Sequence, residues 1–195
     1  MVSPGNANLL HVDWSKIPAP VDDGGAKHLT GMMMADIALP ATDGTRVALA
    51  KLAGRTLVFA YPRTGTPGQI SVVDDWDMIP GARGCTPQSC GFRDLYAELQ
   101  AAGATRVYGL SVQDTAYQQE VVARLHLPFP LLSDENMALA RAINLPLMQA
   151  GHLTLLKRLA LIIDDGRIAH VFYPVFPPDR NAADVLAWLE ANPRP

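Results

Sequence analysis

The chain has 195 residues, 49% of them hydrophobic and 18% charged, with a formal net charge of −3 and an isoelectric point near 5.9. This length and balance fit one globular domain that can bury a substantial core. Lys and Arg are scattered and no apolar run is long enough to cross a bilayer, so neither a nucleic-acid partner nor a membrane is indicated. The first ten residues lack the basic-then-apolar order of a signal peptide, and we expect a soluble cytoplasmic protein.

The first third of the chain predicts an extension, a hairpin and a central strand. Residues 1–30 are rich in Pro and Gly and are interpreted as an N-terminal extension, which leaves residues 31–195 as the domain. Residues 37–49 predict a hairpin that turns at Asp43-Gly44. The continuous apolar run at 56–62, ended by proline, is typical of a buried central strand.

The rest of the chain alternates between helical and strand patterns. An irregular loop at 63–84 precedes a helix whose apolar positions recur at helical spacing up to Gly103 (Phe92, Leu95, Tyr96 and Leu99). The remaining predictions are strands at 106–112 and 129–134, helices at 115–127, 135–143 and 182–192, and a hairpin of strands 158–164 and 167–173 about Asp165-Gly166. This order predicts an α/β sandwich with a central mixed sheet flanked by helices.

The segment GCTPQSCGFRDL, residues 84–95, carries the most specific chemistry. Thr86 can cap the following helix and Pro87 suits its first turn, which places Cys85 at the helix N-terminus. Unpaired backbone N–H groups and the positive end of the helix dipole stabilise a thiolate there, and nearby Arg side chains add to this effect. The thiolate is the nucleophilic form, so this placement activates Cys85 in particular.

Cys90 is the second of two cysteines, and its spacing suggests reversible oxidation. Five residues of regular helix rise about 7.5 Å, and a disulfide tolerates a Cα separation of roughly 7 Å. A Cys85–Cys90 bond therefore requires the first turn to unwind. If Cys85 instead precedes the helix, with Thr86 as its cap, the bond requires less rearrangement. Two thiols close together in a cytosolic chain are more often redox-active or metal-binding than structural.

Other interpretations of these residues are weaker. Inert burial is plausible for Cys90 but does not fit Cys85, which stands between Gly84 and a helix start. A zinc site requires four ligands, usually in paired motifs, and there is no second cysteine pair. A Cys–His nucleophile remains open, although none of the scattered histidines is singled out as a base; these are His11, His28, His126, His152 and His170.

Over roughly residues 32–175 the sequence resembles the peroxiredoxins, specifically the bacterioferritin-comigratory or Q-type subgroup. The resemblance follows family order through IALPATDGTRVALAKLAGRTLVFAYPRTGTPG, GCTPQSCGFRDL, FPLLSDENMALARAINL and RLALIIDDGRIAHVF. It implies a thioredoxin-like α/β sandwich in which Cys85 is the peroxidatic cysteine and Cys90 the resolving one. It also implies that Pro62 and Thr66 shield and orient the peroxide, and that Arg158 is the arginine that a later strand contributes to the site. On sequence alone, Arg158 is equally well interpreted as a surface charge at the end of a strand.

The sequence departs from the family pattern in one place. Gln69 occupies the position of the family's cysteine. An inserted loop at 69–84 separates the preceding Thr66-Pro67-Gly68 from Cys85. We expect the insertion to loop out between Gly68 and Gly84, so that Thr66 returns beside Cys85. The alternative is that Arg83 or a backbone N–H takes over its role.

The resemblance implies a thiol-dependent peroxidase of the atypical 2-Cys type that reduces hydrogen peroxide or organic hydroperoxides. Its partners would be the hydroperoxide and a thioredoxin-like or other dithiol reductant, with the chain as monomer or homodimer. No metal, haem, flavin or other cofactor is implied. Two rival hypotheses are a redox-responsive binding protein and a thiol–disulfide oxidoreductase acting on proteins; the missing Cys-x-x-Cys spacing counts against the second.

Overall fold

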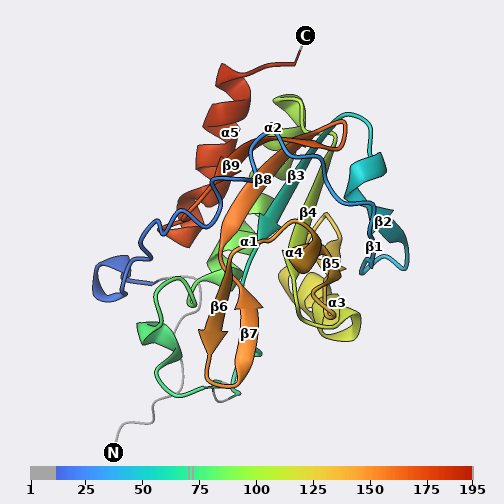
Figure 1. Cartoon of the computed structure of the whole chain (residues 1–195). Coiled ribbons are helices and arrows are strands. Elements are labelled where there is room, and N and C mark those ends of the chain that lie inside the picture. Colours follow the sequence, from blue (N-terminus) through green and yellow to red (C-terminus); the bar gives the residue numbers. More distant parts are fainter. Residues whose placement is uncertain (1–11, 70, 72, 195) are drawn as a thin grey trace, which may run out of the picture.

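The computed structural model describes residues 12–69, 71 and 73–194 as an α/β sandwich (Figure 1). Its five-stranded sheet has the order β5-β4-β3-β8-β9. Strands β3, β4 and β5 run parallel, and β8 and β9 are antiparallel to their neighbours, so the sheet is mixed. The strands are β3 (Arg55–Ala60), β4 (Arg106–Ser111), β5 (Leu131–Ser133), β8 (Leu159–Asp164) and β9 (Arg167–Phe172). The predicted fold class, a mixed sheet flanked by helices, is confirmed.

Helices and smaller hairpins cover the sheet. The helices are α1 (Cys85–Asp94), α2 (Tyr96–Ala101), α3 (Thr115–Leu125), α4 (Ala138–Ala142) and α5 (Asn181–Ala191). The hairpins pair β1 (Ala38–Pro40) with β2 (Arg46–Ala48), and β6 (Leu147–Ala150) with β7 (Leu153–Leu156). Short 3-10 helices lie at Trp14–Lys16, Leu49–Lys51, Trp76–Met78 and Pro178–Arg180. No helix in the described part of the chain combines the length and apolar character needed to span a bilayer.

Aromatic packing fixes α1 against the sheet. All six residues of β3 are buried because the strand is central in the sheet and its alternate side chains enter separate core clusters on the two faces. Phe59 of β3 stacks on Phe92 of α1 with ring centroids 4.4 Å apart. Gly109 makes room for this stack, since a Cβ there would lie 2.5 Å from Leu131 Cδ2 and 2.9 Å from Phe59 Cζ. Burying a side chain such as Phe92 contributes about 1.5–3 kcal/mol, so the last turn of α1 is held against β3.

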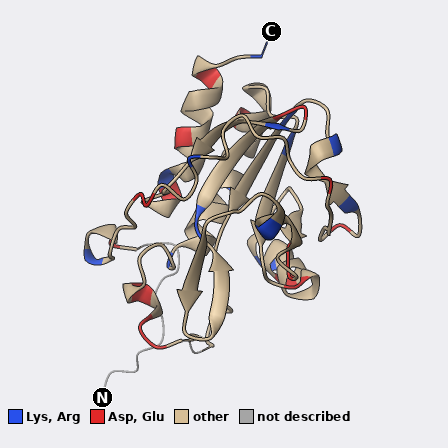
Figure 2. Cartoon of the chain, viewed as in Figure 1, with Lys and Arg blue, Asp and Glu red and all other residues tan. Residues whose placement is uncertain are grey.

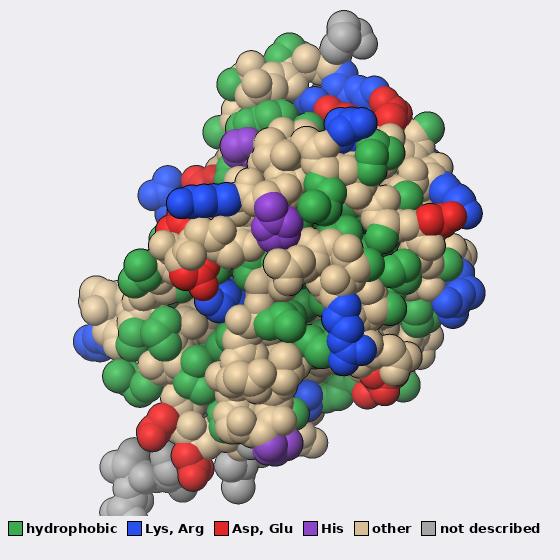
Figure 3. Space-filling view, viewed as in Figure 1, with side chains coloured by type: hydrophobic (Ala, Val, Ile, Leu, Met, Phe, Trp, Pro, Cys, Tyr) green, Lys and Arg blue, Asp and Glu red, His purple; other side chains and the backbone are tan. Residues whose placement is uncertain are grey.

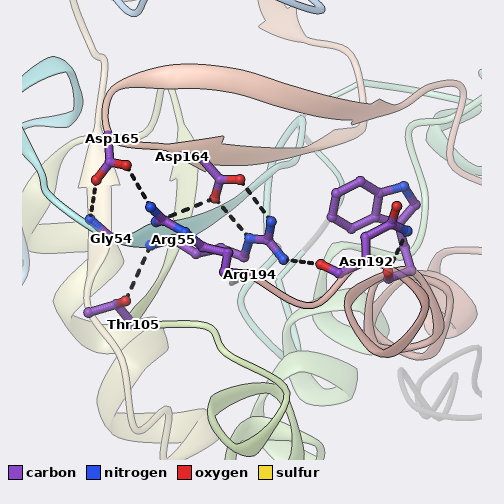
Figure 4. Close-up of polar contacts among 8 residues, drawn as sticks. Gly54, Arg55, Thr105, Asp164, Asp165, Asn192 and Arg194 are labelled. Atoms are coloured by element: carbon purple, nitrogen blue, oxygen red, sulfur yellow. Dashed lines mark hydrogen bonds and ion pairs between the residues drawn. The ribbon is translucent and has the colours of Figure 1, made fainter.

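A polar cluster anchors the far end of α5 to the sheet (Figure 4). The buried Arg55 donates two hydrogen bonds of 2.8 Å to the Asp164 carboxylate and one of 2.7 Å to the Asn192 carbonyl. Arg194 pairs with Asp165 at 2.6 Å. The bidentate pairing of Arg55 with Asp164 is geometrically specific. It ties the chain just after α5 to β3 and to the end of β8.

Most predicted elements are confirmed, with differences at their ends. The turn at Asp165-Gly166 has positive φ at both residues, as the tight hairpin requires. The helix predicted from the α1 region to Gly103 is wrong in one respect, because it breaks at Leu95 into α1 and α2. Helix α3 ends at Leu125 rather than 127, since His126 takes the left-handed conformation before Pro128.

Two segments have more structure than their sequences indicate. The β6–β7 hairpin was not predicted. It packs against the insertion through a small apolar cluster that includes Ala82, Met148 and Leu155 (Figure 1). Within the predicted extension, Leu29 is fully buried against the main core, and just after it the Met34 N–H donates to the Gly166 carbonyl. Residues 1–11 of the predicted extension, and 70 and 72 of the insertion, lie outside the described residues, and the division at residue 30 stays a prediction.

Charges are distributed without a dominant sign on the described surface (Figure 2). Acidic and basic side chains alternate around the molecule, and many form pairs, such as Lys51 with Asp36 and Arg124 with Glu120. Exposed pairs of this kind contribute little to stability, typically below about 1 kcal/mol each. The buried Arg158, by contrast, lies immediately before β8.

Candidate active site

Cys85 is the first residue of α1, and Gly84 is the residue that caps the helix. Gly84 has φ 107°, and a Cβ there would lie 2.5 Å from Pro178 Cγ and 2.8 Å from Trp14 Cη2, so both conformation and space require glycine. The prediction that Thr86 caps the helix is wrong, because Thr86 lies inside the first turn. The N–H groups of this turn have no acceptor in a preceding turn. They and the helix dipole favour negative charge on the Cys85 sulfur.

Arg158 supplies a buried positive charge beside that sulfur. Its side chain is 3% exposed and stands immediately before β8. Nη2 donates to Cys85 Sγ at 3.2 Å and lies 3.1–3.2 Å from the carbonyl oxygens of Gly81, Ala82 and Arg83. Two hydrogens thus serve four acceptors. A thiolate forms the stronger, charge-assisted bond and competes best for them.

Gln88 and Asn181 hold Arg158 in place, and sequence reasoning did not single them out. Arg158 Nη1 donates to Gln88 Oε1 at 2.5 Å, and Gln88 Nε2 donates to Asn181 Oδ1 at 2.9 Å. Gln88 is fully buried and Asn181 is 1% exposed. The spacing of Gln88, three residues after Cys85, was an available signal, because it puts the two on the same side of a helix.

Cys85 is the first residue of α1 and Cys90 lies in the same helix, so the alternative in which Cys85 precedes the helix is wrong. Both cysteines are free and buried. Five residues of helix separate their Cα atoms by a rise of about 7.5 Å and a rotation of about 140°. Burial raises the pKa of the Cys90 thiol, and this residue is therefore protonated at neutral pH.

The described hydrogen bonds connect Thr66 to Tyr117, and the expectation that the loop returns Thr66 beside Cys85 stays a prediction. Thr66 Oγ1 and the Tyr117 hydroxyl are 3.0 Å apart, and the described contacts include no hydrogen bond from Thr66 to Cys85 or Arg158. Pro62 is buried just after β3 and also makes no such bond. Arg83, the alternative to Thr66, directs its guanidinium to Asp77 in an ion pair.

A histidine base and a metal site find no support among the described side chains. None of the described histidines makes a hydrogen bond with Cys85; His170, for example, stacks on Trp188, and burial lowers its pKa. Within the described residues, no three His, Cys, Asp or Glu side chains are grouped to hold a metal ion. The described polar contacts of Cys85 Sγ are with the Arg158 guanidinium and with the Ala82 carbonyl oxygen, 3.6 Å away.

Comparisons with known proteins place this arrangement in a family. The sequence matches the Redoxin family over residues 29–186. It is 31% identical over 165 residues to a Mycobacterium tuberculosis protein named as a peroxiredoxin, which covers 83% of this chain and 96% of that protein. It is 32% identical over 151 residues to the chloroplast peroxiredoxin Q of rice (Oryza sativa subsp. japonica), where the match covers 76% of this chain and 61% of the rice protein, less than two thirds of its length.

Solved structures agree with the sequence comparison. The crystal structure of the peroxidoxin BcpB from Mycobacterium tuberculosis matches with a TM-score of 0.67 and 27% identity, over 85% of this chain and 98% of that one. The Xanthomonas campestris peroxiredoxin Q matches with a TM-score of 0.64 and 23% identity, over 91% and 97%, which supports the fold alone. The predicted resemblance is confirmed, and the chain belongs to the Q-type peroxiredoxins of the Redoxin family.

Proposed function

We propose that this protein is a thiol-dependent peroxidase that reduces hydroperoxides at Cys85. The observation that carries the proposal is the 3.2 Å contact between the buried Arg158 guanidinium and the sulfur of a cysteine that opens a helix. Helix terminus and guanidinium both stabilise the thiolate. The names of the relatives, which are peroxiredoxins, support the same activity.

The first chemical step transfers one oxygen to the sulfur. The Cys85 thiolate attacks the terminal peroxide oxygen, the O–O bond breaks, and the leaving oxygen takes a proton to give water or an alcohol. Cys85 becomes a sulfenic acid. Arg158 and the N–H groups of the first turn of α1 orient the peroxide and stabilise the negative charge that moves onto the leaving oxygen.

The second step forms a disulfide. The Cys90 sulfur attacks the sulfenic sulfur, and the hydroxyl leaves as water with the thiol proton. An external dithiol, thioredoxin-like in chemistry, then reduces the bond, so that one peroxide consumes one dithiol. The raised pKa of Cys90 suits this order, because a protonated thiol does not compete with Cys85 for peroxide.

A coupled assay tests the function. The protein is mixed with thioredoxin, thioredoxin reductase, NADPH and either hydrogen peroxide or tert-butyl hydroperoxide, and NADPH oxidation is followed. We expect turnover that depends on both the peroxide and the protein. Reduction of insulin disulfides without peroxide consumption would instead indicate an oxidoreductase acting on proteins, and neither activity would favour a binding protein.

Disulfide formation should unwind the start of α1. Because both cysteines lie in one regular helix at least a turn apart, the bond cannot form without melting that turn. Oxidised protein is expected to show faster amide exchange over residues 85–93 than reduced protein, while β3 and β8 stay protected in both forms. Equal protection over 85–93, with the disulfide confirmed by mass spectrometry, would rule out unwinding and leave the chemistry in place.

A further inference from the structure

The first described residues of the chain are attached to the segment between β9 and α5. Trp14 opens the 3-10 helix Trp14–Lys16 and is half-buried. Its indole N–H donates to the Asp179 carboxylate at 2.8 Å, and its ring packs edge-on against Phe176 with centroids 6.0 Å apart. The N-terminal segment lies at the left of the molecule in Figure 1, and hydrophobic side chains gather on the surface there (Figure 3).

Trp14 also reaches the residue that caps α1. A Cβ on Gly84 would lie 2.8 Å from Trp14 Cη2 and 2.5 Å from Pro178 Cγ, so these two rings pack directly on the Gly84 backbone. Gly84 and the adjacent Cys85 are both buried. The N-terminal segment therefore packs on the start of the helix at which the chemistry occurs.

Disulfide formation has to disturb this packing. The Cys85–Cys90 bond requires the first turn of α1 to unwind, and Gly84 immediately precedes that turn. Until the turn unwinds, the sulfenic acid at Cys85 is open to a second peroxide, which transfers another oxygen to the sulfur, leaves as water or an alcohol, and converts the sulfenic acid to a sulfinic acid. Packing that holds the turn folded lengthens the time in which this second oxidation can occur.

We propose that Trp14 is a positioning residue for the disulfide-forming step, because it braces the first turn of α1 and so sets how much of the Cys85 sulfenic acid becomes disulfide and how much becomes sulfinic acid. The inference rests on the proposed peroxidase function. Trp14 precedes the segment that matches the family, residues 29–186, so the brace belongs to the N-terminal segment of this chain rather than to the matched domain. Unwinding of α1 in turn loosens the hold on that segment.

Single-turnover kinetics test the brace. Reduced protein is mixed with one equivalent of hydrogen peroxide and quenched at intervals with dimedone and an alkylating agent, and mass spectrometry separates thiol, sulfenic acid, disulfide and sulfinic acid. Trp14→Ala should form the disulfide about tenfold faster than wild type, which corresponds to about 1.4 kcal/mol of packing lost from the folded turn. It should also give less sulfinic acid in excess peroxide, while the rate of the first oxidation stays unchanged.

Three further variants define which part of the contact matters. Trp14→Phe keeps a ring against Gly84 but loses the N–H donor, and its disulfide rate should fall between those of wild type and Trp14→Ala. Asp179→Ala removes the acceptor of that N–H at an exposed position and should also speed disulfide formation. Trp188→Ala is the matched control, since it removes a half-buried indole that stacks on His170 toward the other end of α5, and it should leave the disulfide rate unchanged.

Limited proteolysis gives a measurement that does not depend on rates of oxidation. Lys16 and Lys51 each end a three-residue 3-10 helix, and their side chains are 81% and 69% exposed. Trypsin should cleave after Lys16 faster in the disulfide form than in the reduced form, because unwinding loosens the hold on Trp14, and it should cleave after Lys51 equally fast in both.

Two results would overturn the brace and leave the peroxidase standing. One is a disulfide rate in Trp14→Ala that equals or falls below that of wild type. The other is cleavage after Lys16 that is equally fast in both redox forms, with the disulfide confirmed by mass spectrometry. If peroxide leaves Cys85 unoxidised in the wild-type protein, the proposed function itself is refuted.

Discussion

We expect Cys85→Ser to abolish peroxide reduction, whereas Cys90→Ser should perform one turnover and then stop. A serine hydroxyl is not ionised at the start of α1, so no nucleophile remains in the first variant. In the second, the sulfenic acid forms at Cys85 but has no thiol to condense with. Each variant is the matched control for the other, because both replace a buried cysteine of the same helix with the same side chain.

The measurement is a single-turnover reaction followed by mass spectrometry. Cys90→Ser should gain one oxygen atom, react with dimedone at Cys85 and oxidise further in excess peroxide. Cys85→Ser should gain none. Single-turnover reduction that survives loss of Cys85 but is lost with Cys90 would reverse the two assigned roles.

Arg158→Met should slow the reaction with peroxide by about 100-fold, the typical cost of losing one donor to a developing negative charge. The same change removes the cation that stabilises the Cys85 thiolate, so alkylation of Cys85 by iodoacetamide at neutral pH should also slow. It leaves the Gly81, Ala82 and Arg83 carbonyls without this donor, and the free energy of unfolding should fall by about 1–3 kcal/mol.

Two further variants separate charge from geometry. Arg158→Lys keeps the positive charge but loses the planar fork that reaches both Cys85 and Gln88, and we expect rates between those of wild type and Arg158→Met. Arg141→Met removes an exposed arginine whose guanidinium bonds the Asn136 carbonyl, and it should change neither rate. If a folded Arg158→Met enzyme keeps wild-type rates of peroxide reaction and alkylation, Arg158 has no part in the chemistry.

Local sequence signals predicted the elements that depend on neighbouring residues. The run at 56–62 is largely apolar because β3 lies in the middle of the sheet, and Asp165-Gly166 matches its turn type. Cys85 could be identified for the same reason, since the glycine, cysteine and proline that start the helix lie within four consecutive residues. In each case the determining interactions span only a few residues.

Features that depend on distant segments could not be predicted in the same way. Thr66 satisfies its hydroxyl with Tyr117 of α3, a choice set by the path of the loop rather than by the TPG motif. Gln88 has an obvious position on α1, but its role becomes visible only when Arg158 arrives from the start of β8. The β6–β7 hairpin, with alternate residues of β6 buried, is stabilised by an insertion that no local pattern connects to it.

Helix α5 connects the active-site residues to the polar cluster at the far end of β8. Its first residue, Asn181, accepts a hydrogen bond from Gln88, which in turn accepts one from Arg158. At the other end of the helix, about 16 Å away along the axis, Asn192 and Arg194 form hydrogen bonds with Arg55 and Asp165. The family match stops at residue 186, inside this helix. A fragment that ends at that boundary would keep Asn181 beside the active site but lose Asn192 and Arg194, which attach the helix to the sheet. The last residues of the chain therefore belong in any recombinant form of the enzyme.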